Sequence, residues 1–357
     1  MTDQPIHFAS DNWSGAHPKI VEAMTAANAG AWAPYGGSER DAALDAHFST
    51  LFETETAVFL CTTGTAANAL AIAAMMRPGD VLYTHTEAHV RVDECGAPIF
   101  LSPGLQIDAV AGARGKMDNK ALDFAIRTTI GGGLNAGRVG GLSITQATEA
   151  GTTHTLDEIR ARIETVRGHR ADAPVHMDGA RFANAVAAMD VSLADMTWRQ
   201  GVDILSFGGT KNGCWCAEAI LVFNPAYAEH MRYIRKRAGH LASKMRFMTA
   251  QFEAYLRDDL WLDLANTANA SATQAEAIIA ASPIARLAWP GDINEVFAII
   301  GRAELEKLQK QGLHCALWQP PTAERELVGD DEVMIRLVTS WATSKRELNQ
   351  LADLFKT

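Results

Sequence analysis

The sequence predicts an α/β protein with a large, mostly parallel sheet domain followed by a small α+β domain. Between residues 56 and 224, apolar runs typical of buried strands alternate with helical patterns. Most of these runs are apolar along their whole length, which indicates a sheet covered by helices on both faces. From residue 227 to 281 the pattern is helical, and a shorter mixture of strands and helices follows it.

The elements of the large domain follow from periodicity and from start and stop signals. A helical pattern covers residues 18–30, and residues 56–63 form an apolar strand. The Ala-rich helix 64–76 stops before Pro78, because the residue before a proline avoids helical backbone angles. Residues 80–85 and 138–149 are further strands. Helix 153–169 begins with a capping-box pattern formed by Thr155 and Glu158.

Three strands then follow in quick succession, at residues 173–180, 203–209 and 218–224. The helical passage 227–281 leads into the second domain, where we expect strands at 294–301 and 333–341 and helices at 303–312 and 344–355. We place the boundary near residue 250, with the N-terminal arm and the large domain in 1–250 and the small domain in 251–357.

Composition argues against several classes of function. The formal net charge is −10 and Lys/Arg runs are absent, so nucleic acid and anionic membranes are poor partners. No export signal or long apolar span is visible, and five cysteines, an odd number, favour a reducing compartment, so we expect a cytoplasmic protein. We interpret Cys214 and Cys216 as small buried hydrophobes, because their surroundings lack the spacing of a zinc site, and we expect no metal.

One lysine stands out at the end of a buried strand. Lys211 follows strand 203–209 directly, and such a position is costly unless the charge is paired or the amine is used chemically. Asp178 lies near the end of strand 173–180. The carboxyl ends of strands in an α/β sheet form the ligand crevice, so both side chains can face one pocket. By itself, Asp178 is more typical of a helix cap beside a surface arginine.

A third feature lies between strand 56–63 and helix 64–76. The N–H groups at a helix start are unpaired and the helix dipole favours an anion, so Gly64 and Thr65 are candidates for a phosphate site. The alternative is an ordinary turn capped by a threonine. Pyridoxal 5′-phosphate needs a lysine for its aldehyde, a carboxylate for its ring nitrogen and an anion site for its phosphate. On this interpretation, the two glycines before Lys211 let the backbone pass close to the cofactor.

Seven segments carry a resemblance to a known group of enzymes. In order from residue 8 to residue 339 they read FASDNWSGAHP, YGGSERDAALDAHFSTLF, TGTAANALA, EAHVRVDECGAP, VHMDGARFANA, SFGGTKNG and VMIRLVT. With them the chain resembles the threonine aldolase and β-eliminating lyase group of fold-type I pyridoxal-phosphate enzymes. HMDGARFANA followed by SFGGTKNG is the most specific part, and the resemblance spans nearly the whole chain.

The resemblance implies roles for the residues in the cofactor pocket. Lys211 corresponds to the Schiff-base lysine and Asp178 to the partner of the ring nitrogen. Gly64 and Thr65 correspond to the phosphate turn. His89 corresponds to the histidine that stacks on the ring near the substrate hydroxyl, although a lone histidine here is also typical of a structural, hydrogen-bonded one.

It also implies residues that bind substrate or a second copy of the chain. Ser10 and Arg336 correspond to residues that bind the substrate carboxylate, and Arg181 to an arginine near both the cofactor's phenolic oxygen and that carboxylate. An edge-strand position facing water is the alternative for Arg336. The group places a basic residue near the phosphate with help from a neighbouring subunit. The candidates in the basic segment 232–247, which otherwise reads as a solvated helix face, are Arg237, Lys244 and Arg246.

One segment departs from the group's pattern. Many members carry a histidine where alignment on Gly151 places Glu149, and Gln146 then falls near the cofactor. We expect Glu149 to act as a base or hydrogen-bond partner for the substrate's β-hydroxyl, or else to cap the turn.

The resemblance implies retro-aldol cleavage of L-β-hydroxy-α-amino acids, such as threonine, allo-threonine and phenylserine, to glycine and an aldehyde. β-Elimination and transamination of another amino acid are the alternatives, because the fold hosts all of these reactions. A third hypothesis is a binding protein without catalysis, against which the retained Lys211 argues. The resemblance also implies a homo-oligomer, either a dimer or a tetramer.

Overall fold

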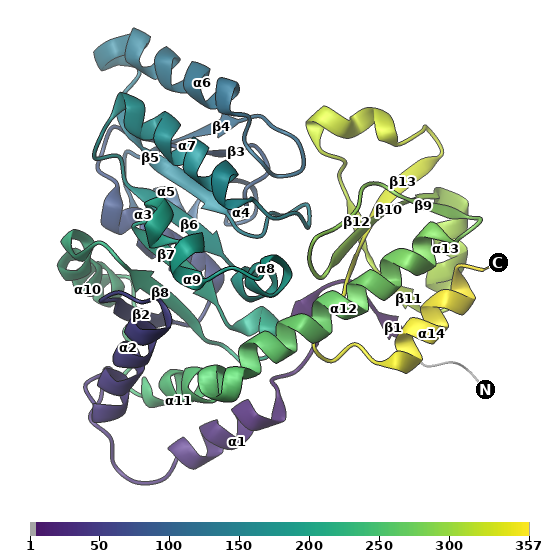
Figure 1. Cartoon of the computed structure of the whole chain (residues 1–357), viewed down its shortest axis with the longest axis horizontal. Helices are drawn as coiled ribbons and strands as arrows, with labels where there is room; N and C mark the ends of the chain where they lie inside the picture. Colours follow the sequence, from purple (N-terminus) through teal and green to yellow (C-terminus); the bar gives the residue numbers. More distant parts are fainter. Residues whose placement is uncertain (1–4, 357) are drawn as a thin grey trace.

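The computed structural model describes residues 5–356, apart from the side chains of residues 322 and 323. Its centre is a seven-stranded sheet in the order β2-β8-β7-β6-β5-β3-β4 (Figure 1). The strands are β2 (Ala57–Cys61), β3 (Asp80–His85), β4 (Gln106–Val110), β5 (Arg138–Thr145), β6 (Val175–Gly179), β7 (Ile204–Gly208) and β8 (Glu218–Val222). Strand β8 runs antiparallel to both neighbours, and the other pairs are parallel, which confirms the mostly parallel sheet.

Helices cover both faces of this sheet. Leu205 and Phe207 of β7 pack in one apolar core and Ile204 packs in another, because successive strand residues point to opposite faces. Helices that contribute to the first core include α2 (Glu39–Leu51), α6 (Asn119–Gly132), α7 (Leu156–His169), α8 (Phe182–Met189) and α11 (Arg246–Leu256). Those that contribute to the second include α3 (Gly64–Met75) and α10 (Ala228–Arg237).

The small domain is an antiparallel sheet with helices packed on it. Its strand order is β12 (Ala316–Trp318), β13 (Glu332–Val338), β10 (Glu295–Gly301) and β9 (Ala285–Leu287), and its helices are α13 (Arg302–Lys310) and α14 (Lys345–Leu354). Strand β1 (Ile6–His7) pairs with β11 (Leu313–His314), and Phe8 is buried in the small-domain core. The N-terminal arm therefore packs on the small domain before the chain enters the large one.

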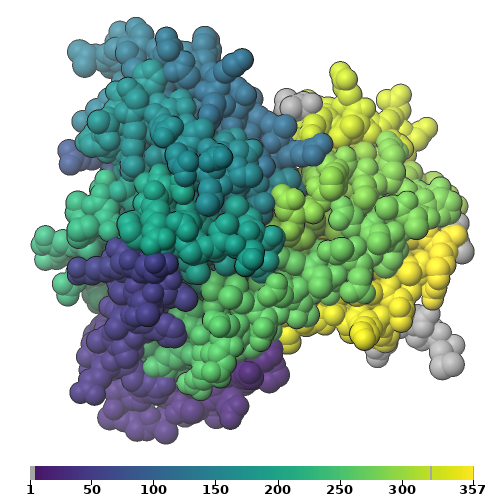
Figure 2. Space-filling model, in the orientation of Figure 1, coloured from purple at the N-terminus to yellow at the C-terminus, as the bar shows by residue number. Residues whose placement is uncertain are grey.

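Helix α12 (Leu260–Ala280) connects the two domains. It packs against α8 of the large domain and against α14 and β10 of the small one. In Figure 2 the yellow C-terminal segments form a lobe beside the large domain, and green α12 lies along their junction. The remaining elements are α1 (Pro18–Ala27), α4 (His89–Val92), α5 (Ala97–Leu101), α9 (Leu193–Met196) and the 3₁₀ turns η1 (Asp11–Trp13), η2 (Gly133–Asn135), η3 (Trp198–Gln200), η4 (Thr210–Asn212), η5 (Pro225–Tyr227), η6 (Arg257–Asp259) and η7 (Thr322–Leu327).

Two predicted elements differ from the structure. The helical passage 227–281 is divided into α10, α11 and α12, with breaks at Gly239 and at Asp258 and Asp259, all of which have positive φ angles. The strand predicted over 138–149 ends at Thr145, and the residues that follow form a turn. The capping box of α7 is confirmed, since Thr155 Oγ1 accepts from Glu158 N–H at 3.2 Å and Glu158 Oε2 from Thr155 N–H at 2.9 Å.

The structure also shows the state of the cysteines, the character of the helices and the grouping of possible metal ligands. All five cysteines are free; Cys214 is buried in the core and Cys216 is half-buried. None of the described helices combines the length and the apolar character needed to cross a membrane. Within residues 5–356, no three His, Cys, Asp or Glu side chains gather in a way that could hold a metal ion.

Candidate active site

One cavity lies at the carboxyl ends of β2, β3, β6 and β7. Its volume is about 260 Å³. The residues that line it are Asn12, Thr62, Thr63, Gly64, Thr65, Asn68, His89, Asp178, Ala180, Thr210, Lys211 and Glu218. Residues distant in sequence meet here because the parallel strands all end at this edge of the sheet. The structure thus brings together Lys211, Asp178, His89 and the Gly64–Thr65 turn, as the sequence predicts.

Lys211 is held on the short turn η4 directly after β7. The carboxylate of Glu218 accepts a hydrogen bond from the Gly209 N–H at 3.1 Å, which fixes the backbone before the lysine. A Cβ atom at Gly208 would lie 2.4 Å from the carbonyl oxygen of Ala180, and one at Gly209 would lie 2.5 Å from that of Ala217. Close contact between neighbouring backbone segments therefore requires these glycines in the folded chain, and their predicted role beside a cofactor stays a prediction.

Asp178 presents a buried carboxylate to the cavity. Its side chain is 1% exposed. Oδ1 accepts from the Ala180 N–H at 3.1 Å, and Oδ2 accepts from Asn68 Nδ2 at 2.9 Å. Burial raises the pKa of this carboxyl group above its ordinary value. A cation placed against Asp178 would therefore be strongly favoured.

The N-terminus of α3 forms another wall of the cavity. Thr63 caps this helix, and its Oγ1 accepts from the Ala66 N–H at 3.1 Å. The N–H groups of Gly64 and Thr65 belong to the first turn, where a helix offers no internal acceptor. A Cβ atom added at Gly64 would meet no atom within 4 Å, so this backbone borders open space. An anion fits such a position.

His89 begins α4 and is tied to a buried acid. Its Nδ1 lies 2.8 Å from Oε1 of Glu94, whose side chain is fully buried. This hydrogen bond is the main cause that raises the pKa of His89, whereas burial of the ring opposes it. His89 is thus hydrogen-bonded, as the structural alternative expects, and it also belongs to the lining of the cavity.

A cluster of buried charges joins the N-terminal arm to both domains. Arg181 donates from Nε and Nη2 to the two oxygens of Asp11, at 2.8 and 3.2 Å. Its Nη1 lies 3.4 Å from Glu295 Oε1, and Arg336 Nη1 donates to the same oxygen at 3.2 Å. Arg336 also stacks on Trp318 at 4.2 Å. Strand β13 lies between β12 and β10, so the edge-strand alternative for Arg336 is wrong.

Glu149 lies in the loop after β5, within range of this cluster and of the cavity. Its side chain is buried, which opposes ionisation, but the charges of Lys211 and Arg181 outweigh burial and hold its pKa below the ordinary value. Glu149 is therefore an ionised carboxylate at neutral pH. Ser10 is half-buried at the start of η1, and its Oγ accepts from the Asn12 N–H at 3.2 Å.

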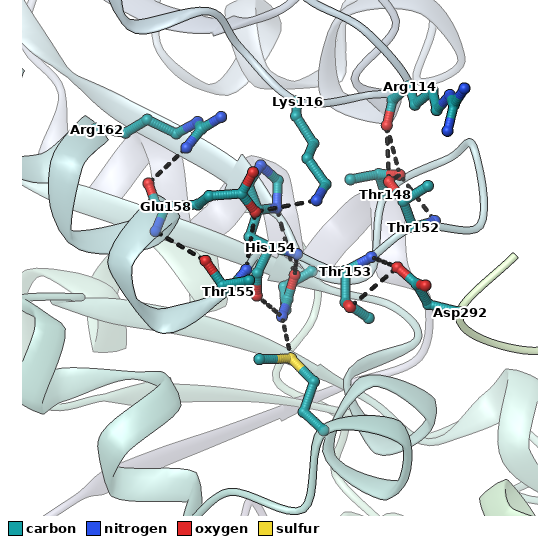
Figure 3. A network of polar contacts seen from close by, with 12 residues as sticks. Arg114, Lys116, Thr148, Thr152, Thr153, His154, Thr155, Glu158, Arg162 and Asp292 are labelled. Atoms are coloured by element: carbon teal, nitrogen blue, oxygen red, sulfur yellow. Dashed lines mark hydrogen bonds and ion pairs between the residues drawn. The ribbon is translucent and has the colours of Figure 1, made fainter. Parts of the chain in front are cut away.

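Four predicted residues lie elsewhere. Gln146 does not line the cavity, because its Oε1 accepts from the His154 N–H at 2.9 Å and its Nε2 donates to the His154 carbonyl at 3.1 Å. Figure 3 shows His154 next to the hydrogen-bonded group formed by Lys116, Thr155 and Glu158. Of the basic candidates, Arg237 and Lys244 are exposed, and Arg246 donates to the Gly30 carbonyl at 2.9 Å. Among the described residues of this single chain, none of these four lines the cavity.

Comparison with known proteins places this arrangement in a family. Residues 7–303 match the family of beta-eliminating lyases. The chain belongs to the beta-eliminating lyase family. A low specificity L-threonine aldolase of Pseudomonas aeruginosa is 38% identical over 353 residues, which cover 99% of this chain and 97% of the relative.

Solved structures show the same fold for this beta-eliminating lyase. A threonine aldolase of Leishmania major superimposes with a TM-score of 0.89 at 26% identity and covers 98% of each chain. An archaeal alanine:glyoxylate aminotransferase superimposes with a TM-score of 0.68 at 16% identity, over 99% of this chain and 91% of the other. The predicted fold, the fold type I architecture of pyridoxal-phosphate enzymes, is confirmed.

The sequence did not identify several polar residues that the lyase places at the site. They are Asp11, Asn68, Glu94, Glu218 and Glu295. Two of them carried a usable signal: Glu94 lies five residues after His89, and Glu218 interrupts the apolar run of residues 214–223. The others are polar residues without a local pattern, and their partners lie far away in the sequence.

The residues of the cavity fit pyridoxal 5′-phosphate. Among the described residues no cation forms an ion pair with the buried Asp178, and a protonated ring nitrogen would supply that partner. The first turn of α3 offers backbone donors to a phosphate, and Lys211 lines the same cavity. Nothing in this donor set conflicts with the cofactor on which the family's chemistry depends.

Proposed function

We propose that this beta-eliminating lyase uses pyridoxal 5′-phosphate to cleave L-β-hydroxy-α-amino acids to glycine and an aldehyde. The observation that carries the proposal is the 38% identity, over 99% of the chain, to a low specificity L-threonine aldolase. The cavity supports it, because Lys211, Asp178 and the helix start at Gly64 lie together. Threonine, allo-threonine and phenylserine are the substrates we expect, and the cytoplasm, which suits five free cysteines, is the location.

Each residue around the cofactor has one task in this proposal. When bound, the cofactor supplies an electron sink for the pair left at the substrate Cα. Lys211 would hold the cofactor's aldehyde with its side-chain amine. Asp178 would keep the ring nitrogen protonated, and the N–H groups of Gly64 and Thr65 would bind the phosphate.

The substrate carboxylate is assigned to Arg336. Its Nε is buried and has no hydrogen-bond partner within the described residues, so a free donor remains although Glu295 occupies Nη1. Arg181 contributes positive charge next to it, while its Nε and Nη2 donate to Asp11 and its Nη1 lies near Glu295. Ser10, in the turn before Asp11, completes the carboxylate site. An arginine–carboxylate contact fixes orientation as well as adding binding energy.

Two groups are placed to accept the proton of the β-hydroxyl. His89 lines the cavity, and Glu149 lies close enough to Lys211 and His89 for its pKa to be lowered by their charges. Either of them takes this proton as the Cα–Cβ bond breaks, and general-base help of this kind contributes on the order of 10²–10⁴-fold in rate.

We also infer a homo-oligomer, a dimer or tetramer. A groove lined by Val21, Met24, Trp215 and Phe247 exposes apolar side chains, and Val21 and Trp215 are 50% and 62% exposed. The basic segment adjoins this groove, since Arg246 bonds to Gly30 just after α1. A second copy on this face would cover the groove and bring Arg237, Lys244 or Arg246 near a neighbouring phosphate.

Two measurements test the proposal. Borohydride reduction of the yellow enzyme followed by peptide mapping is expected to place the label on Lys211, and a label at another lysine would contradict the assignment. Incubation with L-threonine and L-phenylserine is expected to yield glycine with acetaldehyde or benzaldehyde. A keto acid with ammonia would instead identify elimination, and an amino-group transfer to an added keto acid would identify transamination.

A further inference from the structure

A continuous chain of hydrogen bonds runs behind the cavity from His89 to Asp178. His89 Nδ1 lies 2.8 Å from Glu94 Oε1. Asn68, on α3, donates from Nδ2 to the same oxygen of Glu94 at 2.8 Å and to Asp178 Oδ2 at 2.9 Å. Of these four hydrogen-bonded residues, His89 and Asp178 have assigned roles, whereas Glu94 and Asn68 have none.

Glu94 is the least expected member, because it is an acid without access to water. Its side chain is fully buried, and burial raises the pKa of its carboxyl group. An ionised carboxylate in such a place needs strong hydrogen-bond donors. His89 and Asn68 supply such donors, because both bond to Oε1 of Glu94. Oε2 has no partner in the described part of the protein.

The hydrogen-bond geometry indicates which nitrogen of His89 holds the proton when Glu94 is ionised. Asn68 Nδ2 contacts two carboxylate oxygens, so this atom is the amide nitrogen and Glu94 Oε1 is already an acceptor. Donation to Oε1 favours the ionised form of Glu94, which then accepts from Nδ1–H of His89. Since Nδ1 points to buried Glu94 and the ring lines the cavity, Nε2 is the nitrogen that meets a substrate.

Other charges around His89 act without such directional contact. Glu149 after β5 and Asp178 on β6 raise its pKa electrostatically, and Lys211 lines the same cavity. Among the described residues, Glu94 alone is recorded in a hydrogen bond to the His89 ring. Glu149 and Asp178 therefore favour a charged ring but do not choose its tautomer or orientation.

We propose that Glu94 is the positioning residue that keeps the His89 proton on Nδ1 and directs Nε2 toward the substrate. Asn68 holds Glu94 ionised and connects it to Asp178, so the partner of the cofactor ring and the histidine belong to one network. This role of Glu94 rests on the proposed function only for the claim that Nε2 of His89 contacts the β-hydroxyl of the substrate. The state of the His89 ring itself is a property of the folded chain.

The variant Glu94→Gln keeps the shape of the side chain and removes its charge. In the cofactor-loaded enzyme with ¹³C- and ¹⁵N-labelled histidine, the His89 signal is identified by its loss in His89→Asn. We expect the pKa of His89 to fall in Glu94→Gln and the population protonated on Nδ1 in the neutral ring to decrease. kcat for threonine cleavage is expected to fall more than KM rises, within the roughly 10²–10⁴-fold range of general-base help.

A matched control is available at the surface. His169 Nε2 lies 2.7 Å from Asp123 Oδ1, and Asp123→Asn removes that carboxylate without touching the cavity; it is expected to leave the His89 titration and the kinetics unchanged. If Glu94→Gln does not fold, Glu94→Asp is the second variant, because its shorter side chain withdraws the carboxylate from the ring. It is expected to lower the pKa of His89 by less than Glu94→Gln would. An unchanged His89 pKa and tautomer in a folded Glu94 variant would overturn the proposal. An enzyme without aldolase activity but with the expected titration would instead overturn only the proposed function.

Discussion

At the scale of single residues, the site depends on side chains held by short local contacts at strand ends. Lys211 is fixed by η4 and by the bond from Gly209 N–H to Glu218, and Glu218 is itself buried. Burial raises the pKa of Glu218 to about 7. The backbone that carries the lysine is thus anchored by an acid that is only partly ionised at neutral pH, while the amine end remains in the cavity.

The variant Lys211→Ala tests the residue on which the chemistry depends. Without the amine no covalent link to the cofactor aldehyde forms, so we expect the yellow absorbance to be lost and cleavage to fall on the order of 10⁴-fold or more. Absorption spectra and glycine release measure both effects. Lys116→Ala is the control, because Lys116 is also partly buried and pairs with Glu158 at 3.0 Å, outside the cavity. Normal turnover in Lys211→Ala would refute the assignment.

At the scale of elements, prediction from sequence succeeded for the strands that hold the site. Strands β6 and β7 are fully buried, and their sequences are mostly apolar although β6 also holds His176 and Asp178 and β7 holds Ser206. Strand β4 was not predicted because it lies at the edge of the sheet, where Gln106 and Asp108 interrupt the apolar pattern. Helix α2 was missed for a similar reason, since only Leu44 and Phe48 of this helix are buried.

The central strands also carry a buried histidine with a consequence for acid stability. His176 on β6 bonds to Ser143 Oγ at 2.9 Å and to Ser206 Oγ at 3.0 Å, on the two neighbouring strands. Burial lowers the pKa of His176 to about 3. The unfolded chain therefore binds a proton that the folded chain excludes, so this contribution to stability is complete above the unfolded pKa and is lost as pH falls toward the folded one.

We expect His176→Gln to reduce the acid sensitivity of folding. Between about pH 7 and pH 5, wild type should lose about 2 kcal/mol of unfolding free energy more than His176→Gln, from the titration of this histidine in the unfolded state. Urea unfolding midpoints at the two pH values measure the difference. His47→Gln, at an exposed position, is expected to behave as wild type. Equal pH dependence in wild type and His176→Gln would contradict the argument.

At the scale of the whole molecule, the site depends on contacts between distant segments. Asp11 bonds to Arg181 and also accepts from Asn294 Nδ2 at 3.1 Å, so the arm, the large domain and the small domain meet at one carboxylate. Such partners have no shared local pattern and are set by the topology alone. This is why the sequence identified Lys211, Asp178 and the helix start, which follow strands, but not Asp11 or Glu295.

The surface around α1 bears on whether the active enzyme is a single chain or an oligomer. Helix α1 packs on α11, and it lies at the outer surface of the large domain in Figure 2, in purple. Exposed apolar side chains that line a groove favour association, because covering them removes apolar area from water. We therefore expect the enzyme to sediment with a mass of at least two chains.

A matched pair of variants separates this groove from the rest of the surface. Val21→Lys places a charge in the groove, whereas Ile130→Lys places one on α6, and the two side chains are 50% and 51% exposed. We expect Val21→Lys to shift sedimentation toward the mass of one chain and to weaken cofactor binding, because the basic residues of the neighbouring copy move away from the phosphate. Ile130→Lys should leave both unchanged. A wild-type monomer, or loss of association in Ile130→Lys alone, would contradict an interface at α1.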